Sequence, residues 1–171
     1  AAVKIDTLAY MPAQDFGNAF STFIAQNFGA SNTDRIRRGI RTALRITVLF
    51  CLTVSAVIFI FAEPLMRVFV DARETEIIAI GADYLRIEGS FYFGIGILFL
   101  LYGYFRAVKM PGISVVLTVV SLGSRVALAY ALSSLPAFGV TGIWWSVPIG
   151  WILADLIGYY FYRKNRLGVM G

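Results

Sequence analysis

Polar side chains recur at every fourth residue near the N-terminus of this 171-residue chain: Gln14, Asn18, Thr22 and Gln26. A step of four residues advances only about 40° around a helix axis, so these amide and hydroxyl groups form one slanted row. Such groups are costly to expose to hydrocarbon, and they therefore face other helices or water. Hydrogen bonds that hold a bundle together would explain the row. A hydrated cavity is the second interpretation, and the nearby carboxylate of Asp15 favours it.

The next row of the same segment consists of small residues: Ala9, Ala13, Gly17, Ser21, Ala25 and Gly29. A stripe of small side chains lets another helix approach closely. A third row is bulky and apolar. The spacing therefore predicts a helix with one polar face and one face suited to close packing.

Two further ionisable residues, Arg125 and Asp155, interrupt long apolar segments. The Arg125 guanidinium cannot lose its proton, so it needs an anion, backbone carbonyls or water at that depth. Asp15 matches it better in depth than Asp155 does, and a structural ion pair with either would account for it. Asp155 could instead snorkel toward the nearer membrane surface.

The residue types exclude most catalytic chemistry. There is no histidine and only one cysteine, Cys51, and no nucleotide-binding, phosphate-binding or metal-ligand spacing occurs. We therefore predict no enzyme, no cofactor and no metal site. The net charge of +5 comes from short basic clusters beside apolar segments, which indicate membrane orientation and not a nucleic-acid partner.

The elements that position these residues are membrane-spanning helices. Hydrophobic residues make up 58% of the chain and charged residues 15%, and the mean hydropathy is +0.74. An all-α membrane protein follows, because a soluble domain carries about 25% charged residues. Five segments are long enough to cross a bilayer. They comprise residues 7–30, 41–62, 87–108, 112–135 and 140–162.

Basic residues then set the orientation of these segments. Ten lie on one side: Arg35, Arg37, Arg38, Arg41, Arg45, Arg106, Lys109, Arg163, Lys164 and Arg166. Four lie on the other: Lys4, Arg67, Arg73 and Arg86. The ten predict the cytoplasmic side and a cytoplasmic C-terminus. Five spans then require an external start, so we expect earlier helices to precede residue 1.

The long external connection predicts a short amphipathic helix at the membrane surface. Ile77, Ile80, Tyr84 and Leu85 recur at helical spacing within it, opposite its charged residues. The helix would lead into the span at 87–108. We expect Glu88, at the start of that span, to be solvated at the outer interface.

Several short motifs, in order, resemble the multidrug and toxic compound extrusion (MATE) family. The segments that carry the resemblance are 13–22 (AQDFGNAFST), 26–30 (QNFGA), 84–87 (YLRI), 102–107 (YGYFRA), 124–130 (SRVALAY), 142–144 (GIW) and 148–151 (PIGW). Each is short, but the resemblance extends over essentially the whole chain and preserves the order of the segments.

The resemblance implies twelve helices in two six-helix lobes, with residues 1–171 holding the last five helices of the C-terminal lobe. It implies a multi-pass protein of the cell (inner) membrane that exports amphipathic or cationic drugs in exchange for Na⁺ or H⁺ by alternating access. The partners would be the bilayer, small organic cations and the N-terminal lobe, which would hold most of the ion site. Some members have a cation-linked carboxylate where this chain has Tyr102.

The candidate residues of the substrate and ion pathway are therefore Gln14, Asp15, Asn18, Thr22, Gln26, Tyr102, Arg125 and Asp155. Two other functions fit the same spans. One is a flippase for lipid-linked oligosaccharides from the same superfamily, which would need a cationic groove for a pyrophosphate head group. The other is a structural bundle that transports nothing.

Overall fold

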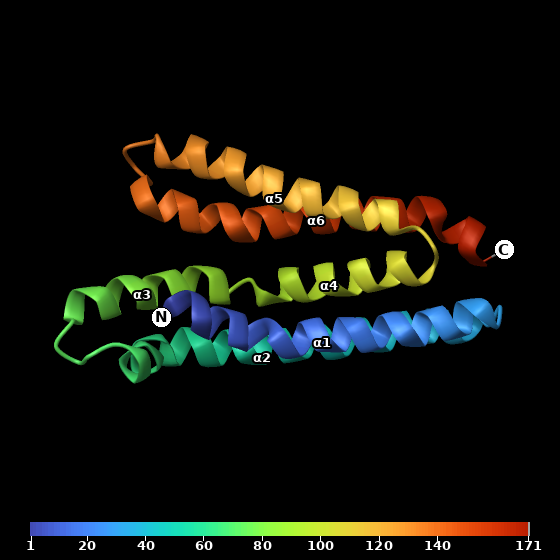
Figure 1. Ribbon diagram of the computed structural model, residues 1–171, viewed down its shortest axis with the longest axis horizontal. Helices are drawn as coiled ribbons and strands as arrows, with labels where there is room; N and C mark the ends of the chain where they lie inside the picture. Colours follow the sequence, from blue (N-terminus) through green and yellow to red (C-terminus); the bar gives the residue numbers. More distant parts are fainter. Residues whose placement is uncertain (171) are drawn as a thin grey trace.

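The computed structural model consists of long helices stacked in three layers (Figure 1). It describes the backbone of residues 1–170 and the side chains of residues 1–165, and no strand occurs among them. The helices are α1 (Ala2–Gly29), α2 (Thr33–Phe69), α3 (Thr75–Gly89), α4 (Tyr92–Ala107), α5 (Pro111–Ser133) and α6 (Gly139–Met170). The expectation of an all-α protein is confirmed. One layer holds α1 and α2, the middle layer α3 and α4, and the last layer α5 and α6.

Local signals explain where the helices begin and bend. The Asn32 side chain accepts a hydrogen bond from the backbone N–H of Arg35 and so caps α2. Pro111 occupies the first turn of α5, where its missing N–H costs nothing. Helix α2 continues beyond the predicted end at residue 62, but its backbone is non-helical at Phe61. Pro64 explains this kink, because its ring clashes with the carbonyl four residues earlier.

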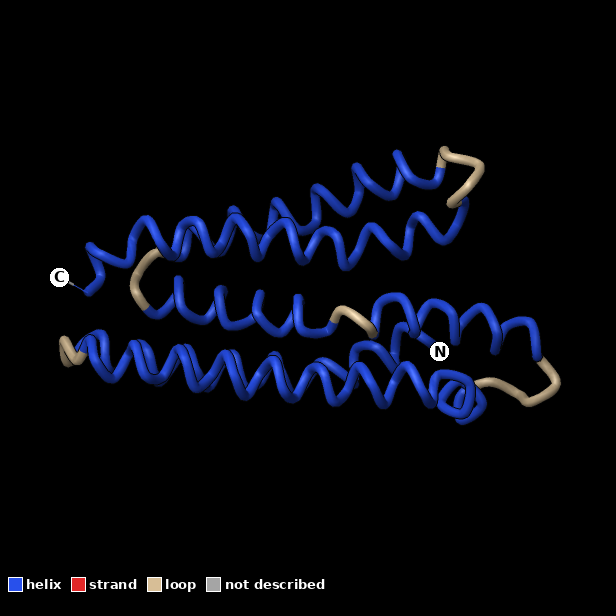
Figure 2. The backbone as a smooth tube through the Cα atoms, turned by 180° about the vertical axis from the view of Figure 1, so that it is seen from behind, coloured by secondary structure: helices blue, strands red, loops and turns tan. Residues whose placement is uncertain are grey.

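The predicted continuous helix over 87–108 is wrong. The structure ends α3 at Gly89 and begins α4 at Tyr92, and the two axes are bent by 50°. Figure 2 shows the short loop at this junction. The Ser90 hydroxyl donates to the Arg86 carbonyl, which competes with the helical ladder at this point. A helix within the long connection is confirmed as the body of α3, but Ile77 and Ile80 of its predicted apolar face are exposed, whereas Ile78 and Leu85 are buried.

Among the described residues, three helices are long and apolar enough to cross a membrane: Thr33–Phe69, Pro111–Ser133 and Gly139–Asn165. The bent pair α3 and α4 would make a fourth span if it counts as one. Helix α1 is not among them in the described part of the chain, because its polar row lowers its hydropathy. The span predicted over residues 7–30 therefore stays a prediction.

Helices α1 and α4 cross closely at the row of small residues. A Cβ added at Gly103 would lie 2.7 Å from the Gly17 carbonyl oxygen, and the Ser21 hydroxyl donates to the Gly103 carbonyl at 2.9 Å. Ala13 and Gly17 are buried. The predicted close approach is confirmed for the middle of the row. This crossing fixes how the polar row of α1 lies beside α4.

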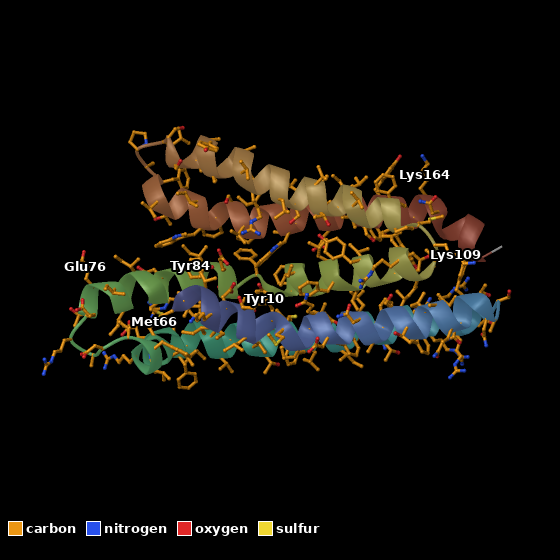
Figure 3. All side chains as sticks on the ribbon, viewed as in Figure 1. Tyr10, Met66, Glu76, Tyr84, Lys109 and Lys164 are labelled. Carbon is orange, nitrogen blue, oxygen red and sulfur yellow. The ribbon has the colours of Figure 1, made fainter. Side chains whose placement is uncertain are left out.

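The connections alternate between the two ends of the molecule. The α1–α2 and α4–α5 connections and the C-terminal end lie together, whereas the α2–α3 and α5–α6 connections lie at the opposite end (Figure 1). Lys109 and Lys164 lie at the first end and Glu76 at the other (Figure 3). The basic loops predicted on one side therefore share one end of the bundle.

Candidate functional site

The polar row of α1 opens onto a groove between α1, α4 and α5. Gln14, Asn18, Thr22 and Gln26 are all exposed. The groove has a volume of about 330 Å³, and its polar lining comprises Gln14, Asn18, Tyr102, Arg106, Ser114 and Thr118. A second groove of about 410 Å³ continues along α1 past Ser21, Thr22 and Gln26. Both contain Asn18 and Arg106, so they form one polar face, which we call the polar groove.

Arg106 is the centre of the polar groove. Its guanidinium donates to Asn18 Oδ1 at 3.1 Å and to the Tyr102 carbonyl at 3.3 Å. The Ser114 hydroxyl donates to the same carbonyl at 3.4 Å. The arrangement presents one permanent positive charge among neutral donors and acceptors. Sequence reasoning counted Arg106 only as an orientation signal, although its position near the end of α4 places it beside the row of α1.

Asp15 lies apart from the groove. It is exposed on α1, and it is not among the described residues that line the two grooves above. A step of one residue turns about 100° around the helix, which directs Asp15 away from the row that holds Gln14 and Asn18. The carboxylate that favoured a hydrated cavity therefore does not line it, although four of the polar residues do.

A buried carboxyl network lies at the α3–α4 junction. Tyr92 donates to Asp6 Oδ1 at 2.7 Å, and Tyr84 donates to Glu88 Oε2 at 2.9 Å. The Asp6 and Glu88 carboxyl groups also lie within hydrogen-bonding reach of each other. Only 4% of Asp6 and 3% of Glu88 is exposed, so the expectation that Glu88 is solvated is wrong. The 50° bend explains this, because it turns the end of α3 inward against α1.

In the described part of the chain, Arg125 does not pair with either of its predicted carboxylate partners. Its charge is felt by both Asp6 and Glu88. Among the described residues it forms no salt bridge with Asp15 or Asp155, which corrects the predicted pairing. Its positive charge is a minor contribution at both carboxyl groups, whose environment is set mainly by burial.

Sequence reasoning missed Asp6 and Glu88, but the four-residue spacing contained the signal. Asp6 and Tyr10 extend the polar row of α1 by two steps toward the N-terminus. Tyr84, Glu88 and Tyr92 follow the same spacing through α3 and into α4. Figure 3 labels Tyr84 on α3 and Tyr10 on α1, on either side of the layer boundary that the network bridges.

Asp155 lies in a different place, on α6. It lines an apolar pocket between α1, α2, α4 and α6. Its Oδ2 lies 3.8 Å from where a Cβ would stand on Gly94, and its Oδ1 is fully buried without a hydrogen-bond partner among the described residues. The predicted site residues thus lie in the polar groove, near the carboxyl network and in this pocket, except Asp15, which is exposed on α1 outside all three.

Several known proteins are similar to this chain in sequence and in fold. The MatE family model matches residues 1–131. The chain is 30% identical to the probable multidrug resistance protein YpnP of Bacillus subtilis, covering 99% of this chain and 38% of that protein. It is 29% identical to the probable multidrug resistance protein NorM of Thermotoga maritima, covering 91% and 32%. It therefore spans about a third of the length of these relatives.

A solved structure has the same fold. The bent form of the MATE transporter VcmN of Vibrio cholerae superimposes with a TM-score of 0.88 at 20% identity, covering 98% of this chain and 38% of that one. The family model covers most of the chain, and the apolar helices fit a multi-pass membrane protein. The chain therefore belongs to the MATE family, whose members are membrane transporters and not enzymes.

Proposed function

We propose that this chain forms most of the C-terminal lobe of an inner-membrane antiporter that exports amphipathic organic cations in exchange for Na⁺ or H⁺. The polar groove is the observation that carries the proposal. A membrane protein gains nothing from an exposed row of amides and hydroxyls unless water, substrate or another lobe meets it. In this account an N-terminal lobe of the same polypeptide faces the groove, and the two lobes rock to open the space between them to either side.

The basic end of the bundle would face the cytoplasm, together with the C-terminus. Groups along the groove would contact the passing substrate through reversible polar contacts. Arg106 would keep the mouth of the groove hydrated and hold Asn18 in place. No covalent step is needed, since transport requires only that the same site be exposed on alternate sides.

The carboxyl network is where this lobe would sense the coupling ion. Asp6 and Glu88 come from different helices and meet at a broken helix, an arrangement that transporters use for cation sites. Two carboxyl groups within hydrogen-bonding reach can share a proton or provide oxygen ligands to Na⁺. Arg125 opposes any added positive charge and so keeps the ion from being held too tightly. Ion binding here would loosen or tighten the contact of α1 with α3 and α4.

The groove is tested by replacing its polar side chains with apolar ones of similar size. Thr22 and Thr53 are both exposed, and each donates its hydroxyl to the carbonyl four residues earlier in its own helix. Only Thr22 lines the groove, whereas Thr53 lies on α2. In proteoliposomes of the complete transporter, Thr22→Val and Asn18→Leu should slow the gradient-driven export of a fluorescent organic cation.

Thr53→Val serves as the matched control and should export like wild type. Reconstituted amounts of each variant are equalised before rates are compared. If Asn18→Leu and Thr22→Val both export as fast as Thr53→Val, the polar row only holds helices together and the proposal fails.

A further inference from the structure

A long groove follows the line where α1 and α2 pack together, apart from the polar groove. Its wider part has a volume of about 640 Å³ and is lined by three phenylalanine rings of α1 and by side chains between residues 35 and 46 of α2. A narrower part of about 170 Å³ continues along the same two helices to Pro12 and Phe50. The two parts share Phe16 and Ile46, so they form one feature, which we call the seam groove.

The seam groove has a charged mouth and an apolar body. Arg35 and Arg38 line it beside the α1–α2 connection, at the basic end of the bundle (Figure 1). The Arg35 guanidinium carbon lies 5.9 Å from the centre of the Phe23 ring, so its charge stands over a ring of the groove wall. Away from the mouth the lining is mostly apolar, with aromatic side chains at Phe16, Phe20, Phe23 and Phe50.

The two arginines at the mouth have no anionic partner in the described part of the chain. The salt bridges described there join Arg86 to Glu63 and Asp83, at the opposite end of the bundle. No aspartate or glutamate is among the described residues that line the seam groove. Arg35 and Arg38 are exposed and three residues apart on one helix, so both guanidinium groups can reach the same anion. Phosphate suits them best, because its oxygens match the paired N–H donors of arginine.

The length of the seam groove matches one lipid molecule. From Arg35 to Phe50, α2 rises about 22 Å at about 1.5 Å per residue. This is about half of the roughly 40–45 Å thickness of a bilayer with its headgroup regions. A free anion would neutralise the arginines and leave the aromatic wall uncovered, whereas an apolar helix would do the opposite. A phospholipid satisfies both parts.

We propose that the seam groove binds an anionic phospholipid, with the headgroup phosphate between Arg35 and Arg38 and one acyl chain along the phenylalanine rings. The proposed orientation places this end of the bundle at the cytoplasmic leaflet, where anionic lipids attract basic residues beside membrane spans. The inference goes beyond the proposed function, because the ligand is a lipid of the membrane and not a transported compound. It also differs from general attraction, which would count every basic residue of the cluster equally.

The charged mouth is tested by native mass spectrometry of the complete transporter in a non-ionic detergent. Dioleoylphosphatidylglycerol is the probe, and dioleoylphosphatidylcholine has the same chains without the net charge. The first should bind at least about tenfold more tightly, equivalent to about 1.4 kcal/mol. The double variant Arg35→Gln, Arg38→Gln should lose most of this preference. Arg37→Gln with Arg41→Gln is the matched control, because it removes equal charge from exposed arginines outside the groove lining, and it should keep phosphatidylglycerol affinity within about threefold.

The apolar body is tested by filling it. Ala19 is exposed and lines the seam groove, so Ala19→Trp should weaken the binding of both lipids at least about threefold. Ala127→Trp makes the same change at an exposed position of α5 and should bind like wild type. Glycerophosphoglycerol, the headgroup without acyl chains, should not displace bound phosphatidylglycerol.

Three results would overturn the inference. Equal losses in the two arginine pairs would mean diffuse attraction to the basic cluster. Displacement by glycerophosphoglycerol would mean a site for a free anion. Unchanged lipid affinity in Ala19→Trp, together with a lower melting temperature, would mean that another helix of the transporter lies in the groove.

Thermal melting also checks that each variant is folded. If the double variant of Arg35 and Arg38 does not fold, Arg35→Gln and Ala19→Trp replace it, and unchanged phosphatidylglycerol binding in both would contradict the site. The measurements use no substrate and no ion gradient, so their outcome is independent of the proposed function.

Discussion

Arg125 is a permanent charge whose field reaches the two buried carboxyl groups, and its partner can be identified by double substitution. Arg125→Gln removes positive potential from Asp6 and Glu88 and should lower the melting temperature. Glu88→Gln in the same chain removes one of the charges left behind, so the double variant should be milder than the sum of the singles. Coupling between interacting charges is about 0.5–3 kcal/mol.

The control is one of the two ion pairs that the sequence suggested for Arg125. Arg125→Gln combined with Asp155→Asn should be additive, because the described structure shows no ion pair between them. Melting temperatures in detergent measure both cycles. Coupling of Arg125 with Asp155 and not with Glu88 would show that the carboxyl network is not its partner.

Asp6 and Glu88 should affect ion coupling more than substrate movement. In proteoliposomes, Asp6→Asn and Glu88→Gln should lose gradient-driven export but retain exchange of labelled for unlabelled substrate at equal concentrations. The reason is that neither residue lines the polar groove. Tyr130→Phe, an exposed tyrosine of α5, provides a control that removes a hydroxyl elsewhere. Equal loss of exchange and export would mean that the network serves only folding.

At this scale the sequence predicted the polar row but not the network. The repeat of Gln14, Asn18, Thr22 and Gln26 depends only on helix periodicity, which is local. Burial of Glu88 depends on the bend between α3 and α4, and on α1 lying against that bend. Neither could be predicted from the segment boundaries. The position of Arg106 in the groove could not be predicted either, because it depends on a tertiary contact with Asn18, a residue 88 positions away.

The crossing of α1 and α4 leaves no room for an added methyl group at Gly103. Gly103→Ala would place a Cβ 2.7 Å from the Gly17 carbonyl oxygen, which is backbone and cannot move aside. We expect a loss of about 1–3 kcal/mol in stability, as for overpacked cores. Gly123→Ala on α5 is the matched control, because nothing lies within 4 Å of the added Cβ. Equal melting temperatures of the two variants in detergent would argue against the close crossing.

The positions of the helices were predictable because apolar length and turn residues are local signals. The kink within α2 and the break between α3 and α4 could not be predicted in this way. Helix α2 continues beyond Pro64 because a proline can bend a helix without ending it, provided that neighbouring helices support both sides. The α3–α4 break arises where the Ser90 hydroxyl bonds the Arg86 carbonyl, and hydropathy alone reads that stretch as continuous.

For the whole molecule, the alternation of connections predicts a fixed sidedness. Single cysteines in a Cys51→Ser background, placed at residues 35–38, should react with a membrane-impermeant thiol reagent only after cells are opened. Cysteines at residues 71–74 or 136–138 should react in intact cells. The physical reason is the excess of arginine and lysine at the first end of the bundle. Labelling of residues 35–38 from outside would reverse the orientation.

The overall architecture follows from composition and family resemblance. The role of the polar groove, in contrast, depends on what lies opposite it. In the proposed function, the polar groove faces a space that the rest of the transporter completes. Sequence reasoning could therefore predict that polar residues share a face, but not which space they enclose.

Hydration of that face is the central claim, and cysteine accessibility tests it most directly. Thr22→Cys and Thr53→Cys are compared in a Cys51→Ser transporter in membranes, using a charged aqueous thiol reagent. Both positions are exposed in this chain, but only residue 22 lines the groove. We predict fast modification at residue 22, slowed by a transported cation, and slow modification at residue 53 within the bilayer. Equal rates at the two positions, or a rate at residue 22 that substrate does not change, would contradict the account.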